Sequence, residues 1–293
     1  MKEYAGKGNA KCPFCNSKRI GLLRNIKSPI NSKNYDHFSC RDCMLEFFLP
    51  LVFEDVYTCE KLDAYAEWHG SIREEYPPWT MEAVEFIRRQ GLDTGNISVL
   101  DVGCGDCISY GALTHYLKIK SVNYYALDVD SKSLSICRKR GVKNTINGFF
   151  GPEATREMKS KFDIIVATEV LEHNTEPKKF FETAFGVLKK GGFLILTVPN
   201  RERLVINLRE SQDLPPHHFL RFNKRFFIHN FGSRVKEVKD YPSPRKYRES
   251  CERLSRRLFK SNLPWPLFAL PMFLLDAVDS LNNRNLFVAL QQG

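Results

Sequence analysis

The sequence predicts an α/β fold in which a mostly parallel β-sheet is covered by helices on both faces. Between residues 97 and 200, short apolar runs of strand length alternate with longer stretches of helical pattern. The apolar runs are 98–102, 124–128, 163–167 and 193–198, and the helical stretches are 107–119, 131–140 and 175–190. Hydrophobic residues make up 43% of the 293 residues, which is enough for a sizeable core and excludes a globally disordered chain.

Two pairs of cysteines stand in the first 50 residues, where helical pattern is scarce. Cys12 and Cys15 form one Cys-x-x-Cys unit, Cys40 and Cys43 form a second, and 24 residues separate the two units. Four thiolates in two such units can surround Zn²⁺ tetrahedrally, and a site closed by four Cys ligands is structural rather than catalytic. Because so short a segment can hardly build a core, we expect the metal to supply its folding free energy. Redox pairs or surface thiols without a metal are the alternatives.

The residues around these units add two expectations. The link between the units contains Pro, Asn and Ser residues between positions 29 and 34, which are typical of a loop. Asn16, directly after the first unit, tolerates the left-handed backbone that such a turn often needs, whereas Met44 after the second unit is less suited to it.

The cysteine count and the apolar segments bear on the compartment. Nine cysteines, an odd number, do not suggest a disulfide framework. The first eleven residues lack the apolar core of a signal peptide. The longest apolar stretch, Leu263–Leu275, is broken by three prolines and is shorter than the about 20 residues of a spanning helix. We expect a soluble cytoplasmic protein, and we expect the five cysteines outside the two units to be packing residues, namely Cys59, Cys104, Cys107, Cys137 and Cys251.

Residues 57–95 carry a helical pattern that is broken at Pro77-Pro78. Val84, Phe86, Ile87 and Leu92 indicate a helix that leads to the first core strand. We therefore expect a helical lead-in or lid before the sheet. At the other end of the chain, the apolar residues 286–290 predict a last strand.

A glycine-rich loop, within residues 99–107, follows the first predicted strand. Gly103 and Gly105 let the backbone turn tightly and let a ligand approach without a Cβ in the way. The loop does not fit the dinucleotide pattern G-x-G-x-x-G, because Ile108 stands at the sixth position. The negative charge of Asp101 would repel a pyrophosphate and favours a cationic ligand such as a sulfonium. An ordinary strand–helix turn is the alternative.

Asp128 ends the second predicted strand, 23 residues after Gly105. This is close to the spacing at which an acidic residue accepts hydrogen bonds from both hydroxyls of a ribose. A helix cap or a loop carboxylate is the structural alternative.

Four segments resemble class I S-adenosylmethionine (SAM)-dependent methyltransferases. In chain order they are Val99–Cys107, Asp128, Phe162–His173 and Leu188–Asn200, and the resemblance covers roughly residues 80–240. It implies an enzyme that transfers a methyl group from SAM. It also implies a Rossmann-like, mostly parallel seven-stranded sheet with helices on both faces.

The resemblance also implies which residues hold SAM. The glycine loop of such enzymes passes the methionine end of SAM, and the residues matching Asp128 and Thr168–Glu169 hold the ribose and line the cofactor. The implied contacts come from Asp101, Gly103, Cys104, Gly105, Asp128, Val129, Thr168 and Glu169. Cys107 departs from the pattern, since it stands where a third glycine is common.

The cysteine units and the segment Pro215–Phe222 are similar to a subset of these enzymes. Many bacterial methyltransferases carry a short N-terminal zinc ribbon and are associated with surface-polysaccharide or modified-sugar biosynthesis. The predicted organisation is a zinc-ribbon module over 1–56, a helical lead-in or lid over 57–95, and a SAM-binding domain over 96–293. The SAM-binding domain includes a substrate or lid segment, residues 201–285, that is basic and partly apolar.

Histidines are the leading candidates for proton transfer. A hydroxyl or amine nucleophile needs a proton acceptor, and the imidazole group suits this task near neutral pH. His217 and His218 follow the predicted fifth strand, at the edge where open α/β sheets bind ligands. His173 and Glu172 follow the fourth strand at the same edge, and Glu169 is a further candidate there. Packing or loop-capping roles are the alternatives, and neighbouring Glu and His residues could also bind a divalent metal.

The charge is unevenly spread. Lys and Arg exceed Asp and Glu by ten, and residues 201–260 account for nine of that excess. This excludes a uniformly basic nucleic-acid coat. The basic stretch 245–260 could bind an acidic substrate, RNA or, with 261–275, a membrane surface, or it could be a solvated helix face.

Three functions remain open on the sequence. The first is methyl transfer to a small polar acceptor such as a sugar or a nucleotide- or carrier-linked sugar, in an enzyme that is cytoplasmic or peripheral to the inner face of the membrane. The second is RNA methylation, in which the ribbon and the basic stretch bind the phosphate backbone. The third is a non-enzymatic interaction protein. The intact glycine loop and Asp128 argue against the third.

Overall fold

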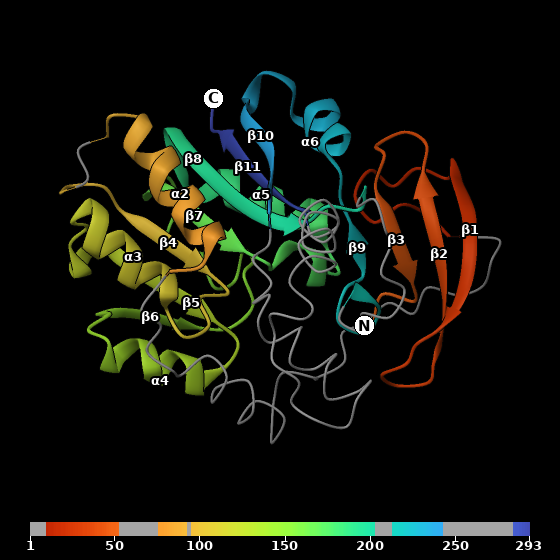
Figure 1. Cartoon of the computed structure of the whole chain (residues 1–293), viewed down its shortest axis with the longest axis horizontal. Coiled ribbons are helices and arrows are strands. Elements are labelled where there is room, and N and C mark those ends of the chain that lie inside the picture. The colour runs from red at the N-terminus through yellow and green to blue at the C-terminus, as the bar shows by residue number, and fades with distance from the viewer. Residues whose placement is uncertain (1–9, 53–75, 93–94, 203–212, 243–283) are drawn as a thin grey trace, which may run out of the picture.

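A computed structural model describes residues 10–52, 76–92, 95–202, 213–242 and 284–293 of the chain (Figure 1). The basic stretch 245–260, the apolar stretch Leu263–Leu275 and most of the predicted lead-in lie outside the described residues. Within the described ranges, no helix combines the length and the apolar character needed to cross a membrane.

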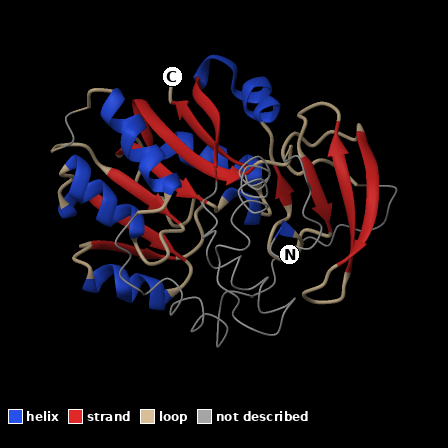
Figure 2. Cartoon of the chain, viewed as in Figure 1, coloured by secondary structure: helices blue, strands red, loops and turns tan. Residues whose placement is uncertain are grey.

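A seven-stranded sheet forms the centre of the molecule (Figures 1 and 2). Its strand order is β10-β11-β8-β7-β4-β5-β6. The pairs among β4 to β8 are parallel, whereas β11 is antiparallel to both β8 and β10. The strands are β4 (Val99–Val102), β5 (Tyr124–Asp128), β6 (Asn144–Asn147), β7 (Phe162–Thr168), β8 (Leu188–Pro199), β10 (Val235–Pro242) and β11 (Arg284–Gln291). The predicted α/β class and the mostly parallel seven-stranded sheet are confirmed.

Helices connect the strands and cover both faces. The α-helices are α2 (Pro78–Arg89), α3 (Ile108–Leu117), α4 (Ser131–Lys139), α5 (Pro177–Val187) and α6 (Lys224–Phe231). The 3₁₀ helices are η1 (Ser121–Asn123), η2 (Leu171–His173) and η4 (Gly232–Arg234). Their starts follow local chemistry: α2 begins at a proline, whose missing N–H costs nothing in the first turn, and Asp130 and Asn223 cap α4 and α6.

Two predictions about secondary structure need correction. The helix predicted over 175–190 ends at Val187, because Leu188 already pairs with Phe162 as the first residue of β8. The link between the cysteine units, predicted as a loop, is mostly the hairpin of β1 (Ile20–Lys27) and β2 (Asn34–Cys40), and Pro29, Asn31 and Ser32 lie in its turn.

Strand alternation divides the core into two parts. In β8, Phe193 and Ile195 face α2, α3 and α4, whereas Leu194 and Leu196 face the side covered by α5 and α6. Phe287 of β11 belongs to the first side, and its neighbours Leu286 and Val288 belong to the second. The sheet is thus buried on both faces, as its apolar strands predict.

The N-terminal module, residues 10–52, is a second, smaller sheet. Its order is β1-β2-β3-β9, where β3 is Glu46–Leu49 and β9 is Leu220–Arg221. The fourth strand therefore comes from the methyltransferase-like part of the chain, some 170 residues after β3. Figure 1 shows β9 between the module and the central sheet.

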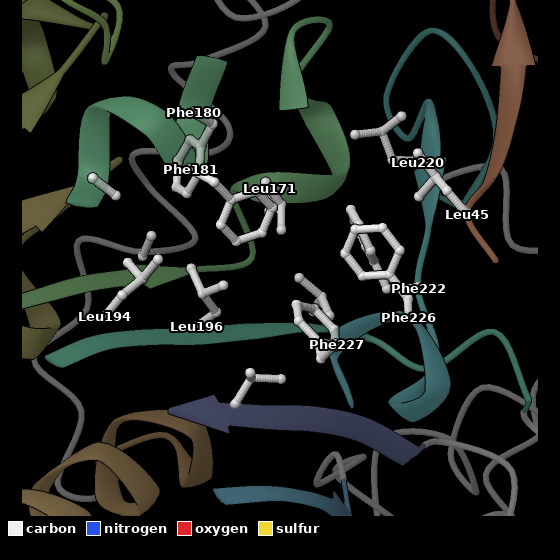
Figure 3. Close-up of a cluster of buried hydrophobic side chains, with 14 of the residues drawn as sticks. Leu45, Leu171, Phe180, Phe181, Leu194, Leu196, Leu220, Phe222, Phe226 and Phe227 are labelled. Atoms are coloured by element: carbon white, nitrogen blue, oxygen red, sulfur yellow. The ribbon is translucent and has the colours of Figure 1, made fainter. Parts of the chain in front are cut away.

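The module shares its core with the α5–α6 side of the large sheet. One continuous cluster of buried side chains contains Leu45 and Phe47 of the module together with Leu196 of β8 and Phe226 of α6. Figure 3 shows Leu45 near Leu220, with the Phe rings of 222, 226 and 227 lying between these residues and β8. The expected 1–56 module is therefore not a separate hydrophobic unit, since its apolar side chains are completed by those of the larger part.

We expect Phe226→Ala to lower the free energy of unfolding by about 3–5 kcal/mol, the usual cost of removing a buried Phe side chain. Phe226 is completely buried, and its ring centroid lies 5.0 Å from those of both Phe14 in the module and Phe222. Chemical denaturation of the full chain measures the change. Ile228→Ala on the same helix is the matched control, because Ile228 is 53% exposed and its truncation should cost under about 0.5 kcal/mol. Equal stabilities of the two variants would contradict the shared core.

Candidate functional site

The glycine loop has the geometry that the sequence indicates. It leaves β4 at Val102, and both Gly103 (φ +64°) and Gly105 (φ +51°) have left-handed backbones that suit glycine. A Cβ on Gly103 would lie 2.5 Å from Cγ2 of Val170, so only glycine fits there. The Gly105 N–H donates to Oδ2 of Asp128 at 2.9 Å.

Asp128 lies at the carboxyl end of β5 and faces the loop. Its Oδ1 accepts from the Asp130 N–H at 2.9 Å, and its Oδ2 accepts from Gly105. An ionised carboxylate offers about four lone-pair sites, so Asp128 keeps acceptor capacity beyond these two hydrogen bonds. A ribose hydroxyl could use that capacity.

The amide of Asn147 fixes the backbone beside this carboxylate. Its Nδ2 donates to the carbonyl oxygens of Asp128 at 3.1 Å and Val129 at 3.0 Å. Val129 therefore lies at the same edge of the sheet as the loop, in agreement with its predicted place next to the cofactor. Its contact with SAM stays a prediction.

Asp101 lies behind the loop. Its side chain is almost fully buried and accepts a hydrogen bond from the Tyr124 hydroxyl. Burial raises the pKa of Asp101 to about 7, which means that a large part of this carboxyl is protonated at neutral pH. Only the ionised fraction of the Asp101 carboxyl would attract a sulfonium. The contact between Asp101 and SAM stays a prediction.

Three cysteines lie beneath the loop, and two of them overturn an expectation. Cys104 is a buried free thiol, as expected of a packing residue, but Cys107 and Cys137 form a disulfide. Cys107 precedes α3 with φ 59°, a left-handed conformation that costs a residue with a Cβ roughly 1–2 kcal/mol. This explains why glycine is common at this position in similar enzymes.

The end of β7 brings acidic and imidazole groups together. Thr168 ends the strand, Glu169 follows with φ 55°, and η2 places Glu172 and His173 next. Burial and the neighbouring Glu169 raise the pKa of Glu172 well above its usual range. Burial lowers the pKa of His173 to about 3, which makes its imidazole a neutral and weak base.

His217 and His218 differ in their roles. His217 offers its backbone carbonyl, which lies 2.7 Å from Nδ1 of His173 and must accept from it. The side chain of His218 contacts two carboxyl groups: Asp213 Oδ1 lies 3.3 Å from Nδ1, and Glu172 Oε1 lies 3.9 Å from Nε2. An ionised Asp213 can only accept, which places the proton on Nδ1 and leaves Nε2 as the basic nitrogen.

His218 lines a small hollow at the carboxyl end of β8. The lining residues are Pro199, Asn200, Arg201, Asp213, His218, Leu220 and Arg221. The hollow has a volume of about 20 Å³, which is room for a water molecule or for one hydroxyl group of a ligand. His217 is not among the lining residues. Of the two tandem histidines, His218 is therefore the one placed to meet a ligand.

Several residues of this site were not found from the sequence. Asp213, Arg201 and Arg221 line the hollow, and Glu46 of the module lies 3.5 Å from Arg201 Nη1 and 3.7 Å from Arg221 Nε. Asp213 had a usable signal, since it stands five residues before His218. The role of Glu46 could not be read from the sequence, because it depends on the pairing of β3 with β9.

The four predicted metal ligands meet at one point. The Sγ atoms of Cys12, Cys15, Cys40 and Cys43 all lie within 4.8 Å of one another. Cys12 and Cys43 are 3.4 Å apart, and Cys15 and Cys40 are 3.5 Å apart. Tetrahedral Zn–S bonds of about 2.3 Å require sulfur separations of about 3.8 Å, so a small adjustment would fit the ion.

The two turns that present these thiols are alike. The N–H after each unit, of Asn16 or Met44, donates to the carbonyl of the first cysteine of that unit. Asn16 has φ 61° and Met44 has φ 65°. Met44 adopts the left-handed backbone despite being less suited to it. The Cys43 thiol lowers the pKa of Cys12 to about 6, which favours the thiolate that binds metals.

The module is bound directly to the segment that carries His218. Glu46 pairs with Arg221 and Phe47 with Leu220 in the β3–β9 ladder, and the Phe48 N–H donates to the Phe219 carbonyl at 2.9 Å. Two further hydrogen bonds join the second cysteine turn to the larger part of the chain. Asn230 Nδ2 donates to the Cys43 carbonyl at 2.9 Å, and Arg201 Nη1 donates to the Met44 carbonyl at 2.6 Å.

Known proteins share this fold and its sequence segments. Residues 100–196 match the family described as "Methyltransferase domain". The chain is 26% identical over 161 residues to ubiquinone biosynthesis O-methyltransferase of Bordetella bronchiseptica, and 28% identical over 161 residues to that of Bordetella avium. Each match covers 52% of this chain and 64% of the relative, so the chain spans less than two thirds of these relatives.

Solved structures agree on the fold. A Galdieria sulphuraria protein described as a sarcosine dimethylglycine methyltransferase has a TM-score of 0.55 at 14% identity, over 80% of this chain and 99% of that one. The Haemonchus contortus "Phospholethanolamine N-methyltransferase 2", solved with S-adenosylhomocysteine, has a TM-score of 0.55 at 13% identity, over 84% of this chain and 62% of that one.

We expect Gly103→Ala to destabilise the chain more than Gly105→Ala, by about 1–3 kcal/mol, the usual cost of overpacking. Both variants force a Cβ onto a left-handed backbone, but only the Cβ at Gly103 meets Val170, while a Cβ at Gly105 meets no atom within 4 Å. Denaturant unfolding of the two variants gives the difference. Equal losses would show that the contact with Val170 does not constrain the loop.

Proposed function

We propose that this chain, which carries a class I SAM-dependent methyltransferase domain, transfers the methyl group of SAM to a hydroxyl of a small polar acceptor. One observation supports this most strongly. The Gly103–Gly105 loop, Asp128 and the hollow at His218 all follow the carboxyl ends of parallel strands, so they share one edge of the sheet.

The residues at this edge suit SAM. Gly103 and Gly105 present no side chain to a ligand, and Asp128 keeps acceptor capacity for ribose hydroxyls beyond its two backbone hydrogen bonds. When bound there, SAM supplies an activated methyl group on a sulfonium that is a good leaving group. The chain's task is to align the acceptor with that methyl and to keep water out.

His218 is the proposed proton acceptor. Asp213 accepts from Nδ1, which leaves Nε2, 3.9 Å from Glu172 Oε1, as the nitrogen that would take the proton of the attacking hydroxyl. The protonated ring would then be stabilised by the Asp213 carboxylate at 3.3 Å. His173 is a poorer candidate, because burial lowers its pKa to about 3. Glu169 remains an alternative acceptor from the end of β7.

The proposed class of acceptor is argued from other observations than the proposed cofactor. The relatives named ubiquinone biosynthesis O-methyltransferase transfer to oxygen by name, which favours a hydroxyl as the reacting group. A sugar or a carrier-linked sugar stays our sequence-based hypothesis for the molecule that carries it. RNA is the second candidate, and the basic stretch 245–260 on which it depends lies outside the described residues.

We also propose that Cys12, Cys15, Cys40 and Cys43 bind one structural Zn²⁺. The sulfur separations and the paired left-handed turns support a site closed by four cysteine ligands. The ion would hold the turn whose carbonyls at Cys43 and Met44 accept from Asn230 and Arg201. The ion would thereby stabilise the acceptor side of the site without taking part in the reaction.

Asp128→Ala should weaken SAM binding by about 5- to 150-fold, because two ribose hydroxyls lose their acceptor at a cost of roughly 1–3 kcal/mol. Isothermal titration calorimetry with SAM measures the change. Asp130→Ala is the matched control: it removes the cap of α4, which accepts from the Lys132 and Ser133 N–H groups, and should lower stability without changing SAM affinity. Wild-type affinity in Asp128→Ala would refute the ribose assignment.

Elemental analysis of protein purified without chelator should find about one zinc per chain. Cys40→Ser should lose the metal and loosen the first 50 residues more than the central sheet, which has its own core. Cys104→Ser, which removes a buried thiol outside the module, should keep the zinc. Absence of zinc from the wild-type chain, or full zinc in Cys40→Ser, would count against the site.

His218→Ala should lower turnover by about 10²- to 10⁴-fold while SAM affinity changes by less than a few-fold. His217→Ala should keep most of the turnover, because His217 does not line the hollow. Transfer of labelled methyl from SAM to hydroxyl-bearing sugars, nucleotide sugars and phenols provides the assay. Wild-type turnover should also fall in acid, since an imidazolium cannot accept a proton. Equal turnover of His218→Ala and His217→Ala would mean that another group accepts the proton.

A further inference from the structure

We propose that Cys107 and Cys137 form a reversible disulfide that sets the affinity of the glycine loop for SAM. The proposal rests on the SAM binding of the proposed function and adds a redox-sensitive modification site to it. No step of methyl transfer uses these sulfur atoms, and the sequence predicted them to be packing residues only.

The sulfur atoms lie directly under the loop. Cys107 immediately precedes α3, Cys137 lies on α4, and their disulfide ties the two helices together. The chain between them includes Asp128, so the disulfide closes a ring that contains the ribose carboxylate. All three residues are buried or half-buried, and Cys107 and Cys137 have no exposed surface.

The disulfide acts on the backbone at the most constrained point of the loop. Cys107 has φ 59° and ψ 38°, a conformation that glycine adopts freely and that a residue with a Cβ tends to leave. Covalent attachment to α4 holds Cys107 in this conformation. After reduction, the backbone at Cys107 is free to relax, and Gly105, two residues earlier, moves with it.

Gly105 connects the sulfur atoms to the cofactor site. Its N–H donates to Asp128 Oδ2 at 2.9 Å, and its carbonyl oxygen lies 3.4 Å from Sγ of Cys137. In the disulfide, Cys137 has no S–H group, whereas the reduced thiol can donate to this carbonyl. Reduction thus changes both the backbone tether and the polar contacts of the peptide that borders the ribose carboxylate.

These contacts give the direction of the effect. The disulfide form holds the loop in place before SAM arrives, and preorganised sites bind more tightly because less ordering is needed on binding. The reduced form binds SAM more weakly. By reciprocity, SAM stabilises the disulfide against reduction by the same factor.

Reduction needs an external reagent, and the step balances. A dithiol gives two electrons and two protons to the Cys107–Cys137 bond, which becomes two thiols while the dithiol becomes a disulfide. Cys104 provides a third sulfur 3.7 Å from Cys137 Sγ. Burial, followed by the charge of Asp101, raises the pKa of the Cys104 thiol, so Cys104 stays protonated and does not displace Cys107.

The test compares one preparation of the full chain in two states. Half is oxidised with diamide and half is reduced with a phosphine, which spares bound metal; both reagents are then removed. Alkylation and peptide mass spectrometry should find a Cys107–Cys137 peptide in the oxidised half only. Calorimetry should show SAM binding about 5- to 150-fold weaker in the reduced half.

Two variants distinguish the effect of the covalent link between Cys107 and Cys137 from the effect of the free thiol groups. Cys137→Ser should bind SAM weakly in both states, because Cys107 keeps its Cβ but loses its attachment. Cys107→Gly should bind more tightly than Cys137→Ser and equally in both states, because glycine holds the left-handed backbone unaided. Cys104→Ser should keep the Cys107–Cys137 peptide and the difference between the two states. Thermal melting of each variant confirms that it is folded.

Absence of the Cys107–Cys137 peptide from the oxidised protein overturns the proposal, as do SAM affinities that agree within twofold in the two wild-type states. Those results leave SAM binding itself intact. Absence of SAM binding in both states overturns the proposed function, and this proposal with it.

Discussion

The pairing of β3 with β9 is the constraint on which the arrangement of the site depends. Two residue pairs, Glu46 with Arg221 and Phe47 with Leu220, join strands that are far apart in the chain. β9 follows His218 by one residue, so the ladder that completes the small sheet also fixes the segment that lines the hollow. The N-terminal module therefore supports the segment that lines the hollow, although the lining residues themselves all lie between 199 and 221.

This pairing explains why the module has no core of its own. Its apolar side chains join those of the α5–α6 side of the large sheet in one cluster, where Phe14 meets Phe181 and Phe226 at ring-centroid distances of 5.9 and 5.0 Å. Burial against the larger part and four thiolates around one ion would then stabilise the same short segment. The proposed metal and the shared core would then stabilise the same surface, which holds the residues that line the hollow.

Much of the fold could be predicted because its signals are local. The β4–α3–β5–α4 alternation and the last strand follow from apolar periodicity, and the glycine loop follows from backbone sterics. β10 escaped prediction because its apolar residues recur every third position with two charged residues between them, whereas a half-buried strand shows a period of two. In the site, Asp128 and the four cysteines could be predicted from spacing. Glu46 and the Cys107–Cys137 disulfide could not, since each depends on contacts between distant segments.

A crystal structure of the full chain with S-adenosylhomocysteine would test the central claim most directly, namely that one sheet edge holds both the cofactor and the acceptor. The account predicts ribose hydroxyls on the two oxygens of Asp128, backbone contacts from Gly103 to Gly105, and a sulfur atom that faces the hollow lined by His218 and Arg201. A ligand seated elsewhere, or a sulfur atom directed away from His218, would contradict it.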